Sequence, residues 1–95
     1  MTNWNLADIK ELPRTVAGAV ERLMLVLDED DKALVMDRPE DDLFALHFGL
    51  GLEIRNAFGL HGLNLELIES CGCSDPDDAS MVIIEGLWRV LRLER

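Results

Sequence analysis

The sequence predicts an all-α fold, a compact bundle of four to five helices around a central apolar helix at about residues 40–58. Three observations support this prediction. Apolar residues recur at spacings of three and four over several stretches, which is typical of helices with one buried face. Capping residues, prolines and glycines stand where these stretches begin and end. No stretch shows the alternation of apolar and polar residues that is typical of a β-strand.

The length of 95 residues gives room for one domain, so we expect residues 1–95 to form a single helical unit. A domain of this size has much surface and little interior. Because 48% of the residues are apolar, some aliphatic side chains are expected to be exposed or covered by a partner, and a homodimer is one candidate.

The N-terminal stretch has no clear helical pattern. It carries Trp4, Leu6 and Ile9, and Pro13 disfavours a helix at the residue before it. We expect residues 1–13 to form an arm, either docked on the domain or flexible.

Two helices are predicted in the next part of the chain. The first runs from about Thr15 to Leu27, with Thr15 as its N-cap and an apolar stripe along one side. The second, at about 29–36, begins in an acidic run that complements the dipole of a helix N-terminus. Pro39 ends it and opens the next helix.

The predicted central helix is apolar over most of its circumference. One face carries apolar residues and a histidine at helical spacing: Leu43, Leu46, His47, Leu50, Ile54, Ala57 and Phe58. Phe44, Phe48 and Leu52 lie on adjoining strips. Such a helix is normally surrounded by other elements, so we expect it at the centre of the bundle. Gly59 is well placed to end it in a left-handed conformation.

Two further helices complete the bundle. Asn64 is expected to cap a short helix at about 65–70, which Gly72 ends. The last helix has the clearest start, because Asp75 is a good N-cap and Pro76 a good first residue. Its predicted buried face consists of Ala79, Val82, Ile83, Leu87, Val90 and Leu91, widened by Ile84 and Trp88.

The formal net charge of −10, from 19 acidic and 9 basic residues, restricts the classes of partner. It argues against direct binding of nucleic acid, which needs clustered Lys and Arg, and against an anionic membrane surface. With no signal peptide and no apolar run of membrane-spanning length, a cytoplasmic protein is expected. Acidity fits simple solubility, a protein partner with a basic surface, or imitation of nucleic acid.

Motifs for metal or catalytic chemistry are weak. The soft metal ligands are Cys71, Cys73, His47 and His61, but Cys-x-Cys is tighter than the usual zinc spacing. We therefore predict no metal and no cofactor. The chain has no Gly-rich phosphate loop, and small all-α chains rarely build the cleft that a Cys–His–Asp nucleophile needs. We predict no catalytic residues and no enzymatic activity.

Arg55 is the most informative polar residue, because its sequence neighbours are strongly apolar. If buried, it needs a carboxylate or several carbonyl groups. Asp77 or Asp78, at the start of the last helix, is a natural partner, and Ser80 can join them. We favour a structural tie between the two helices over a ligand-binding arginine.

Several motifs follow one another in a specific order. They include Ile54-Arg55-Asn56-x-Phe58-Gly59-Leu60, Pro76-Asp77-Asp78-Ala79-Ser80 and Leu87-Trp88. From about Pro13 to Leu91 the chain thereby resembles a family of small bacterial proteins of unknown function. The resemblance implies a bacterial, plasmid or phage-related cytoplasmic protein, and it implies no activity. One departure is His61, where a tryptophan is expected, and this weakens any zinc site that includes His61.

The marker residues of this family coincide with the polar positions of the two long helices. They give one candidate cluster: His47, Arg55, Asn56, Asp77, Asp78, Ser80 and Trp88. Such a cluster is either a buried network that fixes the fold or a surface that recognises a partner. The sequence leaves both open.

The leading functional hypothesis is a small acidic interaction or regulatory module without enzymatic activity, which binds a protein partner. An alternative is an inhibitor that imitates nucleic acid, with the carboxylates of residues 28–42 in a phosphate-binding groove. A third hypothesis is a small enzyme that uses His47, Arg55, Asp77 and Asp78 as acid–base and anion-binding groups around a pocket.

Overall fold

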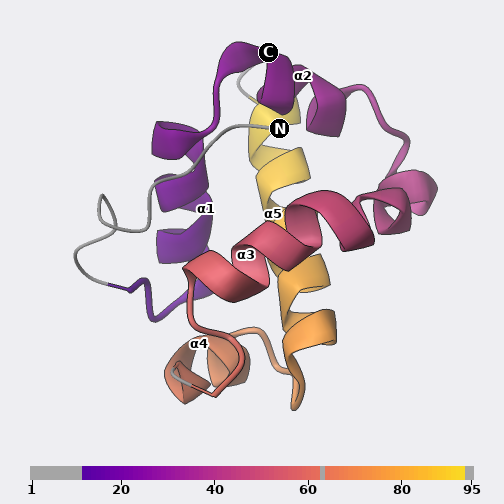
Figure 1. Cartoon of the computed structure of the whole chain (residues 1–95). Coiled ribbons are helices and arrows are strands. Elements are labelled where there is room, and N and C mark those ends of the chain that lie inside the picture. Colours follow the sequence, from indigo (N-terminus) through magenta and orange to yellow (C-terminus); the bar gives the residue numbers. More distant parts are fainter. Residues whose placement is uncertain (1–11, 63, 94–95) are drawn as a thin grey trace.

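A computed structural model describes residues 12–62 and 64–93, without the side chain of His47. Within these residues every regular element is helical, and the predicted all-α bundle is confirmed (Figure 1). The elements are α1 (Val16–Val26), α2 (Glu29–Met36), η2 (Glu40–Leu46), η3 (His47–Gly51), α3 (Leu52–Ala57), α4 (Leu65–Ser70) and α5 (Pro76–Leu93). The expected arm at 1–13 falls outside the described residues except for Leu12 and Pro13, which are half-buried.

The predicted helix starts are confirmed by hydrogen bonds. Thr15, Asn64 and Asp75 each accept a bond from the backbone N–H three residues ahead, at distances of 3.0, 3.4 and 2.8 Å. Asp28 does the same at the start of α2, at 2.8 Å. These bonds satisfy N–H groups that a helix leaves without a partner.

The predicted helix ends are confirmed as well. Gly59 and Gly72 have φ angles of 71° and 72°, the left-handed conformation that favours glycine. Beyond Gly59, the N–H of Leu60 donates to the carbonyl of Arg55 at 3.0 Å, which closes the end of α3. The short connections that follow let α4 and then α5 fold back onto the preceding helices.

The other elements pack on α5. This helix runs through the middle of the molecule, with α1 beside it, α3 crossing it and α4 near its first residues (Figure 1). It contacts each of the other six helical segments. The stretch from η2 to α3 shares the same core, to which it contributes the buried side chains of Leu43, Leu50 and Ile54.

The stretch from η2 to α3 differs from the predicted uniform helix. It is helical throughout, but it begins as a 3₁₀-helix, continues as a π-helix and ends as an α-helix. Phe44, Phe48 and Leu52 are 62%, 77% and 45% exposed, so the expectation that other elements surround this helix is wrong for these side chains. The physical reason is size: α5 covers one face of the stretch, and the described part of this short chain places no helix on the opposite face.

Most of the predicted buried face of α5 is confirmed. Ala79, Ile83, Leu87 and Leu91 are buried, whereas Val82 and Val90 are half-buried. Among the described helices, none combines the length and the apolar character needed to cross a membrane.

Candidate functional site

Arg55 ties α3 to the start of α5, as the sequence indicated. Its side chain is buried, and its Nη1 donates to Ser80 Oγ at 3.1 Å. Its Nε lies 3.5 Å from Asp77 Oδ1. A buried guanidinium needs such partners, because leaving water without them costs several kcal/mol.

Two further features complete this arrangement, which we call the Arg55 clasp (Gly51, Arg55, Asp77 and Ser80). The hydroxyl of Ser80 also donates to the carbonyl of Asp77 at 2.8 Å, so its orientation is fixed. A Cβ atom on Gly51 would lie 3.2 Å from Arg55 Nη1 and 3.6 Å from Ser80 Oγ. Gly51 therefore makes room for the guanidinium.

The other members of the candidate cluster lie elsewhere. Asn56 is exposed, and Asp78 faces a groove described below. Trp88 is two turns further along α5, where its Nε1 donates to the carbonyl of Arg38 at 2.7 Å. The side chain of His47 lies outside the described part of the structure. The structure thus gathers Arg55, Asp77 and Ser80 and separates them from Trp88.

A second arginine holds the other end of α5. Arg92 lies over the ring of Trp88, 4.5 Å from its centroid. Its Nη2 donates to the carbonyls of Met36 and Arg38 at 3.2 and 3.4 Å. These three residues, Arg38, Trp88 and Arg92, form with Met36 what we call the Trp88–Arg92 clasp. It places positive charge at the C-terminus of α2, where the helix dipole favours it.

Asn64 is a buried hub that the sequence indicated only as a helix cap. Its Nδ2 donates to the carbonyls of Pro13 and Phe58, at 2.7 and 2.9 Å. Its Oδ1 accepts from Arg14 at 3.1 Å, besides the capping bond to α4. All four hydrogen-bonding positions of the amide are occupied, so Asn64 serves the fold and is not available to a ligand.

A groove lies between η2 and α5, with a volume of about 470 Å³. Its apolar lining comes from Leu43, Phe44, Met81 and Val82, with Cys73 at one side. Four carboxylates line it as well: Glu40, Asp41, Asp78 and Glu85. We call this feature the acidic groove. The sequence showed the acidic starts of both helices, but it did not show that they meet.

The charges of the acidic groove are only partly balanced. Arg89 forms ion pairs with Glu85 and with Glu40, the latter at 3.7 Å. Within the described chain, Asp41 and Asp78 have no ion pair with a basic side chain. Outside the groove, the neighbouring carboxylate of Asp75 raises the pKa of Asp78 above its ordinary value.

The two cysteines are protonated thiols at neutral pH. Burial raises the pKa of Cys71 to about 11, and burial also raises the pKa of Cys73. Cys71 Sγ lies 3.6 Å from the carbonyl of Ala79, and Cys73 Sγ lies 3.5 Å from that of Cys71. Thiols with raised pKa values are poor nucleophiles and poor metal ligands.

Within residues 12–62 and 64–93, no three His, Cys, Asp or Glu side chains are placed so that they could hold a metal ion together. Among the residues of the enzyme hypothesis whose side chains are described, Asp78 lines the acidic groove and Arg55 is buried in its clasp. The acidic groove offers apolar contact and negative charge, which are features of a binding surface.

Comparison with known proteins gives one match. No curated protein and no solved structure matches the chain. The pattern of one family, described as a domain of unknown function (DUF6794), matches residues 12–91. This range includes the Arg55 clasp, Asn64 and the acidic groove, and it ends one residue before Arg92 of the Trp88–Arg92 clasp. Because the match covers most of the sequence, the chain belongs to this family of domains of unknown function.

Proposed function

We propose that this protein is a small non-enzymatic interaction module, and that the acidic groove binds a basic, amphipathic segment of a partner protein. The observation that carries the proposal is the combination of apolar side chains and four carboxylates in the lining of one groove. Apolar contact supplies affinity through burial, and the carboxylates select and attract a positively charged partner.

The groove has positions for both kinds of contact. Phe44 is 62% exposed at its edge, and an aromatic side chain in such a place is a frequent centre of binding energy. Asp41 and Asp78 supply negative charge that Arg89 does not neutralise. A Lys or Arg of the partner therefore contributes more binding free energy beside Asp41 or Asp78 than beside Glu40 or Glu85, because Glu40 and Glu85 already share Arg89.

The nucleic-acid mimic draws less support from the structure. It needs the carboxylates of residues 28–42 on one surface at a spacing like that of phosphates. Asp28 instead caps α2, Asp31 is buried, and Asp42 pairs with Arg38 at 2.8 Å. These acids serve separate local roles, which favours the groove as the binding surface.

The enzyme hypothesis also draws less support. Its anion-binding residue, Arg55, already contacts Asp77 and Ser80. A general acid or base must reach a substrate, and a buried arginine in a closed network does not offer one an open site.

The test is titration with a synthetic probe: a helical peptide with Lys on one face and Leu and Phe on the other. Its control has Glu in place of every Lys. Calorimetry is expected to show binding of the Lys peptide that weakens as salt rises, and no binding of the Glu peptide. The variant Asp41→Asn/Asp78→Asn is expected to bind at least tenfold more weakly, through the loss of two contacts of about 1 kcal/mol each.

The matched control removes the same charge outside the groove. Asp30→Asn/Glu66→Asn changes two exposed acids on α2 and α4 and is expected to bind the Lys peptide like the unaltered protein. Equal weakening in both double variants would contradict the proposal, because it would mean general attraction to an acidic protein. A Phe44→Ala variant with unchanged affinity would contradict the role of the apolar lining.

A further inference from the structure

A second hollow lies on another side of α5, where this helix packs against α1. Its volume is about 500 Å³, and its lining by described residues is almost wholly apolar: Val16, Ala17, Val20, Met24, Gly86 and Val90, with Glu21 as the one charged residue among them. The acidic runs at 28–31, 40–42 and 75–78 do not line it. Nothing in the proposed binding of a basic segment uses this hollow.

The hollow exists because small residues stand where the helices meet. A Cβ on Gly86 would lie 3.1 Å from Val20 Cγ2 and 3.6 Å from Val16 Cγ1, so α5 and α1 approach closely at this point. Ala17 lies about one turn before Val20 on α1 and is exposed. Its methyl group is too small to fill the space. The surface is therefore concave at its centre.

Larger side chains follow the small ones at helical spacing. On α1, the positions 17, 20 and 24 are separated by three and four residues, and on α5 the positions 86, 90 and 93 are separated by four and three. Leu93, which continues the strip on α5, is 85% exposed. One face thus carries both a depression and protruding apolar side chains. We call it the α1/α5 face (Ala17, Val20, Met24, Gly86, Val90 and Leu93).

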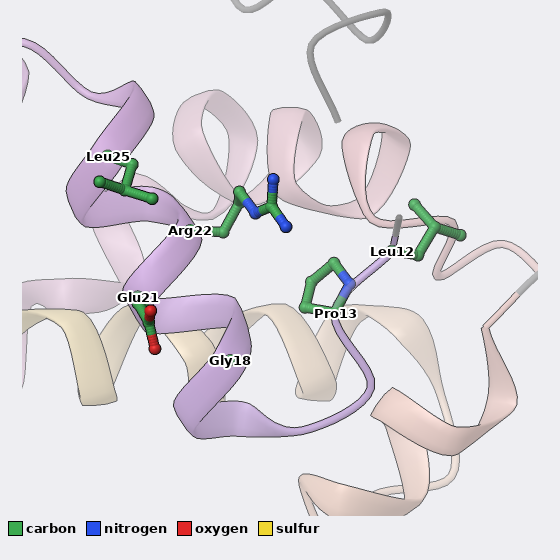
Figure 2. A pocket seen from close by; sticks show the side chains of 6 residues that line it. All are labelled: Leu12, Pro13, Gly18, Glu21, Arg22 and Leu25. Atoms are coloured by element: carbon green, nitrogen blue, oxygen red, sulfur yellow. The ribbon is translucent and has the colours of Figure 1, made fainter. Parts of the chain in front are cut away.

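Charged side chains stand at the edge of this face. Glu21 also lines a neighbouring hollow with Leu12, Pro13 and Arg22, so it marks the boundary between the two. Figure 2 shows that neighbouring hollow, in which Arg22 projects from α1 towards Pro13 and away from Glu21. The centre of the α1/α5 face is left without charge.

We propose that the α1/α5 face is the interface between two copies of this chain, related by a two-fold axis that brings α1 and α5 of each copy together as a four-helix arrangement. A two-fold interface must be complementary to itself, and this face carries the depression and the side chains to fill it. With −10 on each copy, association favours a face with little acidic charge, and among the described residues Glu21 is the only acidic one in the lining of this hollow.

The size of the α1/α5 face sets the expected affinity between the two copies. Each strip spans eight residues, or about 10 Å of helix, which is small beside a standard interface of about 800 Å² per partner. We therefore expect a dimer with a dissociation constant in the micromolar range. Salt should strengthen it by screening the repulsion between the copies, whereas salt should weaken binding of a basic peptide in the acidic groove.

The experiment is sedimentation equilibrium of the full chain at about 5 to 500 µM, in low and in high salt. The expected result is a monomer–dimer equilibrium with at least a threefold smaller dissociation constant in high salt. Ala17→Lys is expected to abolish the dimer, because it buries an ammonium group at the centre of the face. Ala17 is exposed in the monomer, so the melting temperature of a dilute sample should not change.

The matched control is Leu34→Lys, which adds the same charge at an exposed apolar position of α2 outside the face. It should dimerise at least as well as the unaltered chain. A monomer at every concentration and salt would overturn the proposal, and so would a dimer that Ala17→Lys leaves intact. A dimer lost in Phe48→Lys but kept in Ala17→Lys would place the interface on η3 instead. None of these results alters the peptide titration, which tests the acidic groove separately.

Discussion

The two ends of α5 are each held by an arginine, but in opposite surroundings. At the N-terminal end, Arg55 is 5% exposed and contacts two side chains, Ser80 and Asp77. At the C-terminal end, the exposed Arg92 lies on Trp88 and contacts backbone carbonyls of Met36 and Arg38. The guanidinium of Arg55 is thus shielded from water, and that of Arg92 is exposed to it.

Burial decides what each arginine contributes. Inside the protein, every hydrogen bond that is lost leaves a group without water to replace it, so the loss is large. At the surface, water replaces the lost contacts, and exposed charge pairs typically contribute up to about 1 kcal/mol. The same residue type is therefore a structural requirement at one end of α5 and a minor addition at the other.

The strongest test of this comparison is Arg55→Ala. We expect it to lower the free energy of unfolding by about 2–4 kcal/mol, through a cavity and a lost charge-assisted hydrogen bond. Asp77 is well exposed, so its carboxylate returns to water and the loss stays below that of a fully buried ion pair. Urea denaturation followed by circular dichroism measures the change. A difference below about 0.5 kcal/mol, typical of surface substitutions, would show that Arg55 is not a structural clasp.

Gly51 provides a control that acts on the same atoms. Gly51→Ala crowds the unaltered protein, because the new Cβ lies 3.2 Å from Arg55 Nη1, and this strain opposes the gain of about 1 kcal/mol that Ala brings over Gly at helical backbone angles. In the Arg55→Ala background the crowded atom is gone, so the same change should be more favourable there than in the unaltered protein. Additive effects of the two changes would mean that Gly51 does not serve the guanidinium.

The Arg55 clasp could be predicted from the sequence, and the Trp88–Arg92 clasp could not. Arg55 stands among apolar residues, and Asp77 and Ser80 follow a clear helix start, so both halves of the contact carry local signals. Arg89 and Arg92 are visible in the sequence near the end of α5. The sequence could not show that Arg92 meets the end of α2, because backbone carbonyls carry no sequence signal of their own.

The exposure of Phe44 and Phe48 escaped prediction for a related reason. Periodicity indicates which residues share a face, but not whether the chain has another element to cover that face. The acidic groove is a similar case, since the acidic starts of η2 and α5 are visible in the sequence while their proximity is a property of the fold. Elements and their ends depend on local chemistry, and the surfaces between them depend on packing.

The counterpart of the first test is Arg92→Ala. We expect it to lower the free energy of unfolding by about 1 kcal/mol or less, because it removes an exposed cation–π contact and long hydrogen bonds to two carbonyls. The same urea denaturation, carried out beside Arg55→Ala, measures it. If Arg92→Ala lowered the free energy of unfolding as much as Arg55→Ala does, burial would not decide what each arginine contributes.

The smallest expected effect is a pH dependence at the N-terminal end of α5, where Cys71 lies against the carbonyl of Ala79. Burial raises the pKa of Cys71 from 9.0 to about 11, so the folded chain keeps this proton in a range where the unfolded chain loses it. The stability it contributes is present below pH 9 and falls as the pH rises towards 11. Cys71 is only half-buried, so solvent screening keeps the effect small. Thermal melts between pH 8 and 11 should fall more steeply for the unaltered protein than for Cys71→Ser, whose hydroxyl does not titrate there. Parallel curves would show that the environment of Cys71 is open to water, like that of Arg92.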